Sequence, residues 1–295
     1  MSTVKQFSQK MLRLVLIALC FSLSESVLGR SRYANLHLLR RINELKRTSS
    51  VWRPSASTTF DWQLTGNINT NNPAHVYDVD LFLVPATTIT YLHQQGKKVI
   101  CYFSAGTFEH DGTGKTVRPD VVGFPNDVKG TTLIDWPHEQ WLDIRRSEVK
   151  TIMTNRLKLA RDKGCDAVEP DNVDGFANDN GFDLQADDQL KFNIWIAQEA
   201  HSYGLSVGLK NDIGQIEELE PYFDWALNEE CVAFGECNDY QPFIQANKAV
   251  FHVEYVNNHS EGPSRKTAVC NSNSRPRQLI TLIKDWDLSD WFLSC

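Results

Sequence analysis

Short apolar runs recur along the chain, and each of them ends in polar or small residues. Such runs, bounded by turn-forming residues, are typical of strands buried in a sheet. Several are separated by longer stretches in which apolar residues return every three or four positions, the spacing of a helix. The pattern predicts eight strands, at residues 60–66, 80–84, 98–106, 166–171, 205–211, 223–230, 249–256 and 279–285.

The helical stretches end in glycine, and an apolar run follows each of them. Residues 147–164 have apolar side chains at helical spacing and end at Gly164. Residues 186–204 repeat this plan, and a shorter stretch at 88–97 precedes the third predicted strand. Glycine is a common stop signal of helices. A helix, a glycine and then a strand form the repeating unit of a parallel sheet.

Eight strands with intervening helices predict an α/β fold, a single-domain (β/α)8 TIM-type barrel over residues 52–295. A doubly wound open sheet is the alternative. It is disfavoured because no G-x-G-x-x-G motif follows a predicted strand. The longest insertion, residues 105–140, carries glycine, proline and aromatic residues and is predicted to form one wall of a site.

The N-terminal segment has the layout of a secretory signal peptide. Basic residues precede the apolar run 14–21, and small residues follow it. The run is too short for a membrane span of about 20 residues. We predict a signal peptide at residues 1–29, with an amphipathic first helix as the alternative, and a secreted, extracellular protein. Residues 30–51 are basic and are predicted to be either a propeptide or an exposed arm.

The charge balance argues against nucleic acid as a partner, because the formal net charge is −7 and nucleic-acid binders are usually basic. Residues 1–47 hold nine Lys or Arg and two Glu, so their removal takes away seven net positive charges and leaves −14. We predict a monomer with no membrane span and no nucleic-acid partner.

Six cysteines follow the predicted signal peptide, a number that permits disulfides in a secreted protein. Cys231 and Cys237 are the first predicted pair, and Cys270 with Cys295 is the next. Cys101 lies in an apolar run and is expected to be a buried thiol. No cysteine spacing resembles a zinc site. We predict neither a metal nor a cofactor.

Carboxylates gather where the fourth predicted strand ends. The stretch DAVEPDNVDGF, residues 166–176, holds four acids, and Glu169 and Asp171 share the parity that points into a barrel mouth. Catalytic groups of such barrels come from the C-terminal ends of the strands. The same argument places further candidates at this rim: Asn172 and Asp174 in the loop above, Lys210 and Asn211, Glu229 or Glu230, and Glu254 with Tyr255.

Paired carboxylates at a rim suit glycoside hydrolysis, in which one protonates the leaving oxygen and the other is a nucleophile or activates water. Lys210 is predicted to keep one carboxylate ionised. An acid at a strand end also serves as a helix cap, and a buried lysine as a structural ion-pair partner, so these alternatives stay open. The aromatic residues predicted to stack on sugar rings, each with a core role as the alternative, are Trp62, Trp136, Trp141 and Tyr102.

Other reaction classes lack their motifs. Residues 171–181 lack the twelfth-position Glu of an EF-hand calcium loop. The chain has neither the HExxH motif of metalloproteases nor the GxSxG elbow of lipases.

Several motifs resemble those of the endo-α-1,4-polygalactosaminidase family, glycoside hydrolase family 114. They run in order over most of the chain that follows the basic arm, and the longest of them make the match specific. The family implies a secreted (β/α)8 barrel that cleaves polymers of α-1,4-linked galactosamine, which are cationic when deacetylated. The matching stretches are FDWQLTG, YDVDLFLV, GKKVICYFSAGTFE, RPD, WLDIR, GCDAVEPDNVDGF, AHSYGLSVGLKN and FDWALNEEC.

The resemblance also implies site residues. The acid of its EPDN motif falls on Asp171, with Glu169 beside it, and the carboxylate of a motif resembling NEQC falls on Glu229. Here Glu230 replaces the Gln of that motif, and parity with Trp225 favours Glu229 as the acting residue. Asp171 is assigned as nucleophile or base and Glu229 as general acid, with the reverse assignment open.

The remaining candidates are assigned to substrate binding, and the predicted partner is a polysaccharide, a cationic galactosamine polymer. A secreted glycan-binding barrel without turnover is the alternative function. The substrate-binding set is Glu169, Asn172, Asp174, Lys210, Asn211, Tyr102, Glu230, Glu254 and Trp141.

Overall fold

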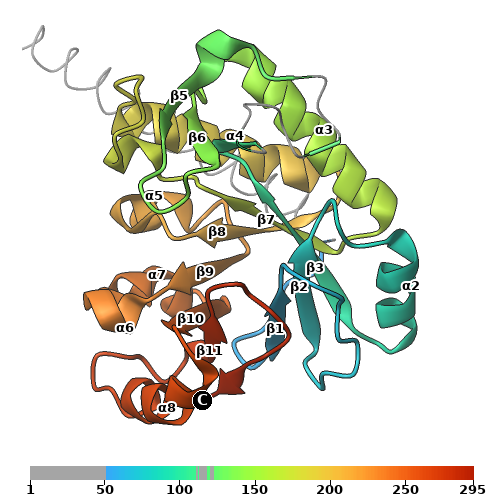
Figure 1. The fold of residues 1–295 in the computed structure, drawn as a ribbon, viewed down its shortest axis with the longest axis vertical. Helices are drawn as coiled ribbons and strands as arrows, with labels where there is room; N and C mark the ends of the chain where they lie inside the picture. The colour runs from blue at the N-terminus through green and yellow to red at the C-terminus, as the bar shows by residue number, and fades with distance from the viewer. Residues whose placement is uncertain (1–50, 111, 113–117, 120–122) are drawn as a thin grey trace, which may run out of the picture. The chain divides into compact units, whose positions relative to one another are not determined.

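A computed structural model shows the fold of the chain (Figure 1). The predicted signal peptide, and the basic arm up to residue 50, lie outside the described residues, so both remain predictions. The structure describes residues 51–110, 112, 118–119 and 123–295.

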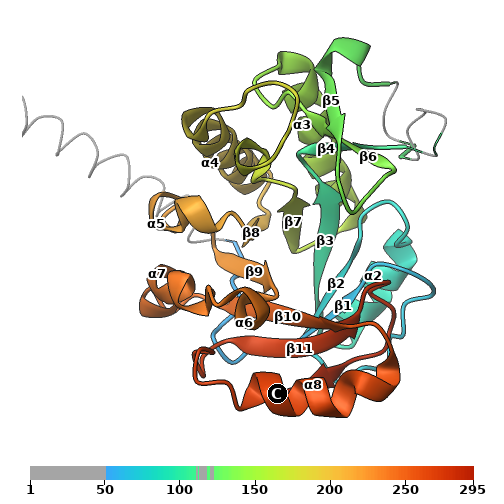
Figure 2. The same cartoon turned by 60° about the vertical axis from the view of Figure 1, so that its left-hand side comes forward.

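Eight parallel strands form a curled sheet in chain order, as the sequence predicts for a (β/α)8 TIM-type barrel (Figures 1 and 2). A short antiparallel strand, β12 (Leu293–Ser294), pairs with the last of them. The parallel strands are β1 (Phe60–Gln63), β2 (Val76–Asp80), β3 (Lys98–Ser104), β7 (Ala167–Asp171), β8 (Ser206–Lys210), β9 (Trp225–Glu229), β10 (Val250–Val256) and β11 (Ile280–Asp285).

Loop contacts join the two ends of this sheet. Among the described residues, β1 and β11 share no strand pairing. Instead, the backbone N–H of Leu64 donates to the carbonyl oxygen of Leu288 at 3.0 Å. The hydroxyl of Thr65 donates to the carbonyl oxygen of Asp287 at 2.6 Å. The segments that follow β1 and β11 therefore meet at the rim where the catalytic groups were predicted.

The second strand was predicted at the wrong place along the chain. Residues 80–84 were predicted as the strand, but β2 ends at Asp80 and the apolar residues after it form a turn. The Asp80 carboxylate ends the strand by accepting hydrogen bonds from the N–H groups of Phe82 at 2.8 Å and Leu83 at 2.9 Å. The apolar run was misleading because β2 itself carries two buried acids, Asp78 and Asp80, which interrupt its hydrophobic pattern.

Two layers of core follow from the alternation of side chains along the strands. One set fills the space between the sheet and the helices. The other set lies inside the sheet and includes Trp62, Trp225 and Phe251. Gly208 makes room for this interior set, because a Cβ atom there would lie 2.4 Å from the Trp225 ring.

Helices cover the outside of the sheet, and the three predicted from the sequence are present. The predicted helix at 147–164 is α3, which ends where Gly164 adopts a left-handed backbone with φ of 93°. After β8, β9 and β10 the helices are shorter. The helices are α2 (Ala86–Gln94), α3 (Ser147–Lys163), α4 (Ala186–Ser202), α5 (Ile216–Leu219), α6 (Cys231–Phe234), α7 (Gln241–Gln245) and α8 (Gly262–Cys270).

The insertion between β3 and α3 folds into a small antiparallel sheet in the order β4-β6-β5 (Figure 2). Its strands are β4 (Thr107–Glu109), β5 (Lys129–Thr132) and β6 (Glu139–Leu142). Trp141 of β6 is buried against Gly175, the first residue of the 3₁₀ turn after β7, which anchors the small sheet to the barrel.

The described residues form three disulfides, which confirm two predictions and correct one. Cys231 pairs with Cys237, and Cys270 pairs with Cys295, as predicted. Cys101 was expected to be a free buried thiol, but it pairs with Cys165. Cys165 lies between α3 and β7, and β7 is the neighbour of the strand that carries Cys101, so the parallel pairing brings together two cysteines 64 residues apart.

Removal of a disulfide is expected to destabilise the protein more when the disulfide closes a longer loop. In the chain-entropy account, the Cys101→Ala/Cys165→Ala variant loses roughly 4 kcal/mol of unfolding free energy, and the Cys231→Ala/Cys237→Ala variant roughly 2 kcal/mol. Urea unfolding of the two double variants measures this difference. An equal loss in both would contradict the loop-length argument.

Candidate active site

Lys210 is the centre of the site at the C-terminal end of the barrel. Its side chain is 2% exposed and points inward from the end of β8. The ammonium group lies 3.2 Å from Oε1 of Glu169, 3.1 Å from Oδ1 of Asp171 and 3.3 Å from Oε2 of Glu229. One buried cation therefore joins carboxylates from β7 and β9, the strands on either side of its own.

The Asp171 carboxylate accepts hydrogen bonds on both oxygens. Oδ2 accepts the phenol hydroxyl of Tyr102 at 3.0 Å, and Oδ1 accepts the backbone N–H of Asn172 at 2.7 Å. Asn172 has a left-handed backbone with φ of 58°, and its side-chain oxygen accepts a hydrogen bond from Ser104 Oγ at 3.1 Å. These donors and Lys210 hold the Asp171 carboxylate in a fixed orientation.

Glu229 is held from two neighbouring strands. Asn211 donates from Nδ2 to Oε2 of Glu229 at 3.0 Å and accepts the backbone N–H of Glu229 at 3.0 Å. Tyr255, on β10, donates its hydroxyl to Oε1 of Glu229. Asn211 thus fixes both the backbone and the carboxylate of Glu229.

Below the lysine lies a pair of buried acids. Glu169 and Asp78 are both fully buried. Burial, followed by the charge of Glu169, raises the pKa of Asp78 well above its usual range. Burial raises the pKa of Glu169 to about 7, although Lys210 opposes the rise. We infer that Asp78 is the protonated member of the pair, because two adjacent buried carboxylates cannot both be ionised cheaply.

A cleft of about 1290 Å³ opens above Lys210. Asp171 and Glu229 have 17% and 28% of their side chains exposed, so both are accessible from the cleft, whereas Glu169 is sealed off. Trp136 and Trp286 are exposed over about half of their surfaces. The aromatic residues along the cleft are Trp62, Tyr102, Trp136, Trp141, Phe176, Phe234, Tyr255 and Trp286.

The cleft is strongly acidic. Among the described residues that line it, eleven are carboxylic acids, and only Arg118 and Lys210 are basic. Arg118 is itself paired with Asp80 at 2.9 Å and with Glu109. The acids are Asp80, Glu109, Asp135, Glu139, Asp171, Asp174, Asp212, Glu229, Glu230, Glu236 and Asp287.

Most of the predicted substrate-binding residues line this cleft: Tyr102, Trp141, Asn172, Asp174, Lys210, Asn211 and Glu230. Glu169 instead lies under Lys210, with no exposed surface. Trp62 was predicted to stack on a sugar ring, but its side chain is only 1% exposed. It lies under the lysine, whose ammonium group is 4.8 Å from the centre of the ring.

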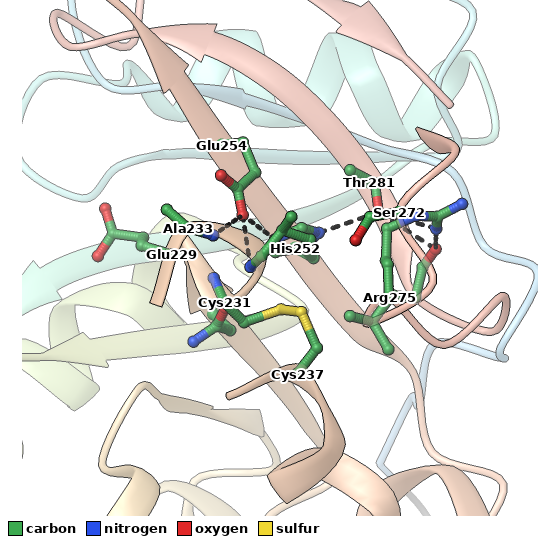
Figure 3. Close-up of polar contacts among 12 residues, drawn as sticks. Glu229, Cys231, Ala233, Cys237, His252, Glu254, Ser272, Arg275 and Thr281 are labelled. Atoms are coloured by element: carbon green, nitrogen blue, oxygen red, sulfur yellow. Dashed lines mark hydrogen bonds and ion pairs between the residues drawn. A yellow bond between two sulfur atoms is a disulfide. The ribbon is translucent and has the colours of Figure 1, made fainter. Parts of the chain in front are cut away.

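The placement of Glu254 at the rim is corrected by the structure. Its side chain is fully buried and points away from the cleft, where Oε1 accepts hydrogen bonds from His252 at 3.0 Å and from the N–H of Val232 at 2.7 Å (Figure 3). Arg265 donates to its other oxygen. Side chains alternate along β10, so Tyr255 faces the cleft and Glu254 faces outward.

The Cys231–Cys237 disulfide lies beside His252 in the same region (Figure 3). The ligand atoms of these three residues lie within 4.8 Å of one another, a spacing that suits a metal ion. Because the two sulfurs are bonded to each other, they offer no thiolate to a metal.

Several residues of the cleft, and one buried residue beneath it, were missing from the predicted set. Asp78 was hidden by the misassigned second strand, although two acids alternate in its apolar stretch. Tyr255 was noted at a strand end, but Glu254 beside it was chosen. Glu139 lies in the insertion, which was predicted to form a wall of the site without any of its residues being singled out. Burial raises the pKa of Glu139 to about 7. Asp212 directly follows Lys210-Asn211 and lines the cleft.

Asp212 is expected to make the protein less stable as the pH rises. Burial, followed by the charge of Asp174, raises its pKa to about 8. A carboxyl whose pKa is raised by folding stabilises the fold fully below its unfolded pKa of about 4, and that contribution is lost as the pH passes about 8. Asp212→Asn removes the titration, so the loss of unfolding free energy between pH 5 and pH 8.5 should shrink by at least about 1 kcal/mol.

Urea unfolding at both pH values measures the effect. Asp183→Asn is the control, because Asp183 also has a left-handed backbone, with φ of 52°, but is exposed and lies outside the cleft. Parallel pH profiles for Asp212→Asn and the parent protein would show that Asp212 is already ionised at low pH.

Comparison with known proteins identifies relatives of this chain. The model of glycoside-hydrolase family GH114 matches residues 42–295. Aspergillus fumigatus Ega3, solved in complex with galactosamine, is 41% identical, with a TM-score of 0.77 over 83% of this chain and 97% of Ega3.

The glycoside hydrolase domain of PelA from Pseudomonas aeruginosa, solved as the variant E218A, is 13% identical, with a TM-score of 0.63 over 82% of this chain and 99% of that domain. At this identity the likeness concerns the fold alone. No match was found among curated proteins. Within the described residues, no helix is long and apolar enough to cross a membrane.

Proposed function

Because the chain belongs to glycoside-hydrolase family GH114 and is a glycosidase, we propose that it cleaves α-1,4-galactosaminidic bonds in a galactosamine-containing polysaccharide. The observation that carries the proposal is the pair of accessible carboxylates, Asp171 and Glu229, which share Lys210 at the floor of an acidic cleft. Among the described residues, these two are the carboxylates that meet this cation from the side of the cleft.

In the proposed reaction Asp171 is the nucleophile and Glu229 the general acid. Tyr102, the Asn172 N–H and Lys210 hold Asp171 as an anion ready to attack the anomeric carbon. Glu229 is the more exposed of the two and is therefore assigned to protonate the leaving oxygen.

The spacing of the two carboxylates favours retention of configuration. Asp171 Oδ1 and Glu229 Oε2 lie 3.1 and 3.3 Å from the same nitrogen, so these oxygens are no farther apart than the sum of the two contacts. Inverting enzymes separate their carboxyl groups by about 6.5–9.5 Å to admit a water molecule, and retaining enzymes by about 5–5.5 Å. The shared lysine keeps one oxygen of each carboxylate close to the other, which supports retention as part of the proposal.

The charge of the cleft supports a cationic substrate. Galactosamine residues that carry free amines are positively charged at neutral pH, and an acidic cleft concentrates such a polymer near the catalytic groups. The relative solved with galactosamine supports the same sugar. The open cleft and its two accessible carboxylates disfavour the alternative of a glycan-binding barrel without turnover.

Secretion is part of the proposal. Three disulfides form and persist in oxidising compartments outside the cytosol, and the N-terminal residues have the composition of a signal peptide. The monomeric state stays a prediction, which sedimentation of the purified protein tests.

Digestion of a deacetylated galactosamine polymer by the purified protein tests the proposed function, with mass spectrometry of the products. Galactosamine oligomers of several lengths are the expected result, and NMR of the first-formed product should show an α-anomer. A polymer that remains intact, while another α-linked glycan is cleaved, would overturn the assigned substrate.

A further inference from the structure

Two acids in the cleft lack the basic partners that the catalytic pair has. Asp174 lies in the loop after β7, Asp212 lies two residues after β8, and both line the cleft. Among the described residues, neither forms an ion pair with a lysine or an arginine within 4.0 Å. Asp212 is 2% exposed, and its Oδ1 atom is buried without a hydrogen-bond partner. A buried acceptor without a donor is costly in free energy, so this oxygen is suited to accept a hydrogen bond from a ligand.

The chain holds these two acids at a fixed spacing. Asn193, a fully buried residue of α4, donates from Nδ2 to the carbonyl oxygen of Val173 at 2.9 Å and to Oδ2 of Asp212 at 2.8 Å. Gln189 fixes the Asn193 amide by donating to its oxygen at 2.9 Å. One side chain therefore ties the residue before Asp174 to Asp212.

The backbone of Asp212 adds to this constraint. Its φ of 48° lies in the left-handed region, which non-glycine residues adopt at some cost. Asn211, which holds Glu229, is left-handed as well, with φ of 46°. The turn after Lys210 thus places one side chain on the proposed catalytic acid and the next in the cleft wall.

The surroundings of the two acids favour a cation. Burial raises the pKa of Asp174 to about 6, with the charge of Asp171 adding to the rise. Burial and the charge of Asp174 raise that of Asp212 to about 8. The charge of Asp174 thus disfavours the ionisation of Asp212, and a positive ligand group between the two acids would stabilise both as anions.

We propose that Asp174 and Asp212 form the binding site for the ammonium group of one galactosamine unit, and that they make the enzyme prefer free amines to acetamido groups. The inference rests on the proposed function and names the residues behind its substrate class. An ammonium group has three N–H donors, and Asp212 Oδ1 and the partly exposed Asp174 carboxyl offer it acceptors. An acetamido nitrogen is neutral, has one N–H and carries a bulky acyl group, so it matches this site poorly.

Two substrates and two variants test the proposal. The kcat/KM of the parent protein, Asp174→Asn and Asp212→Asn is measured on matched galactosamine oligomers with free and with acetylated amines. Each variant is expected to lose about 10- to 100-fold on the free-amine oligomer, because a hydrogen bond to a charged group is lost. On the acetylated oligomer the change should stay below about threefold. Asp183→Asn, an exposed left-handed aspartate outside the cleft, should change neither value.

Equal losses on both oligomers would overturn the proposal, because they would indicate a general effect on the fold or on catalysis. Calorimetric binding of galactosamine and of N-acetylgalactosamine keeps the test independent of turnover. A parent protein that cleaves neither oligomer contradicts the proposed function; if it also binds both sugars equally, the ammonium site is contradicted as well. A preference for galactosamine that disappears in Asp174→Asn and Asp212→Asn supports the site whether or not the polymer is cleaved.

Discussion

Asp171→Asn and Glu229→Gln are each expected to abolish most hydrolysis of the galactosamine polymer while the barrel stays folded. Both substitutions keep the size of the side chain and remove the ionisable group. Loss of a general acid or base typically reduces the rate by about 10²–10⁴, and loss of a nucleophile by more. Asp171→Asn should therefore be the more severe. Reducing-end assays measure the rate, and thermal unfolding checks the fold.

Glu230→Gln is the matched control for Glu229→Gln. Glu230 is the next residue, lines the same cleft and has a left-handed backbone with φ of 62°, but makes no contact with Lys210 within 4.0 Å. We expect a milder effect, of less than about tenfold. If Glu230→Gln were inactive and Glu229→Gln active, the assignment of the acid on β9 would be wrong by one residue. Parent-like activity in all three variants would refute the proposed site.

Lys210→Met is expected to lower the unfolding free energy by about 3–5 kcal/mol near neutral pH and to abolish activity. The substitution keeps much of the apolar stem but leaves Glu169, Asp171 and Glu229 without their shared cation, and unpaired buried charges carry a cost of this size. Without the lysine, ionisation of these carboxyls costs more free energy in the folded state than in the unfolded chain. Their stabilising contribution is then lost as the pH rises, so the variant should lose more stability at pH 8 than at pH 5.

Lys248→Met is the comparison for this loss. Lys248 also forms an ion pair, with Glu220 at 2.7 Å, and donates to the carbonyl oxygen of Phe223 at 2.8 Å, but it meets one carboxylate and lies outside the cleft. Its removal leaves one carboxylate without its cation, whereas removal of Lys210 leaves three. Urea unfolding of both variants at pH 5 and pH 8 should show the larger and more pH-dependent loss for Lys210→Met. A similar loss for both would contradict the role of Lys210 as the shared counter-ion.

The spacing of residues within single segments predicted the main helices, the inward side chains of the strands and the position of the acids at the rim. The periodicity of 147–164 and its terminal glycine define α3, because a helix depends on neighbours three and four residues apart. Alternation along a strand placed Asp171 and Glu229 on the inner side of the barrel, since parity is a property of the strand alone. The order of the acids relative to the apolar runs put them at the C-terminal rim. The family resemblance rested on the same contiguous stretches.

Alternation also shows where local pattern failed. In β2 the acids Asp78 and Asp80 point inward and break the apolar run, so the strand was assigned to residues 80–84, which turn. At β10 two adjacent residues qualified for the rim, and Glu254 was chosen although Tyr255 has the inward parity. The first error comes from taking hydrophobicity as the sign of a strand where the barrel interior is polar, and the second from choosing a residue by its acidity rather than by its parity.

Only the tertiary structure decided which of these residues meet. Lys210, Glu169, Asp171 and Glu229 converge because β7, β8 and β9 are neighbours with a particular register, and Asn193 reaches Asp212 because α4 packs across the loops that follow β7 and β8. The pairing of Cys101 with Cys165 has the same origin. Strand order, register and helix packing arise from the simultaneous burial of surfaces far apart in the chain. No spacing within a single segment therefore specifies them, whereas it does specify which side of its own strand each residue faces.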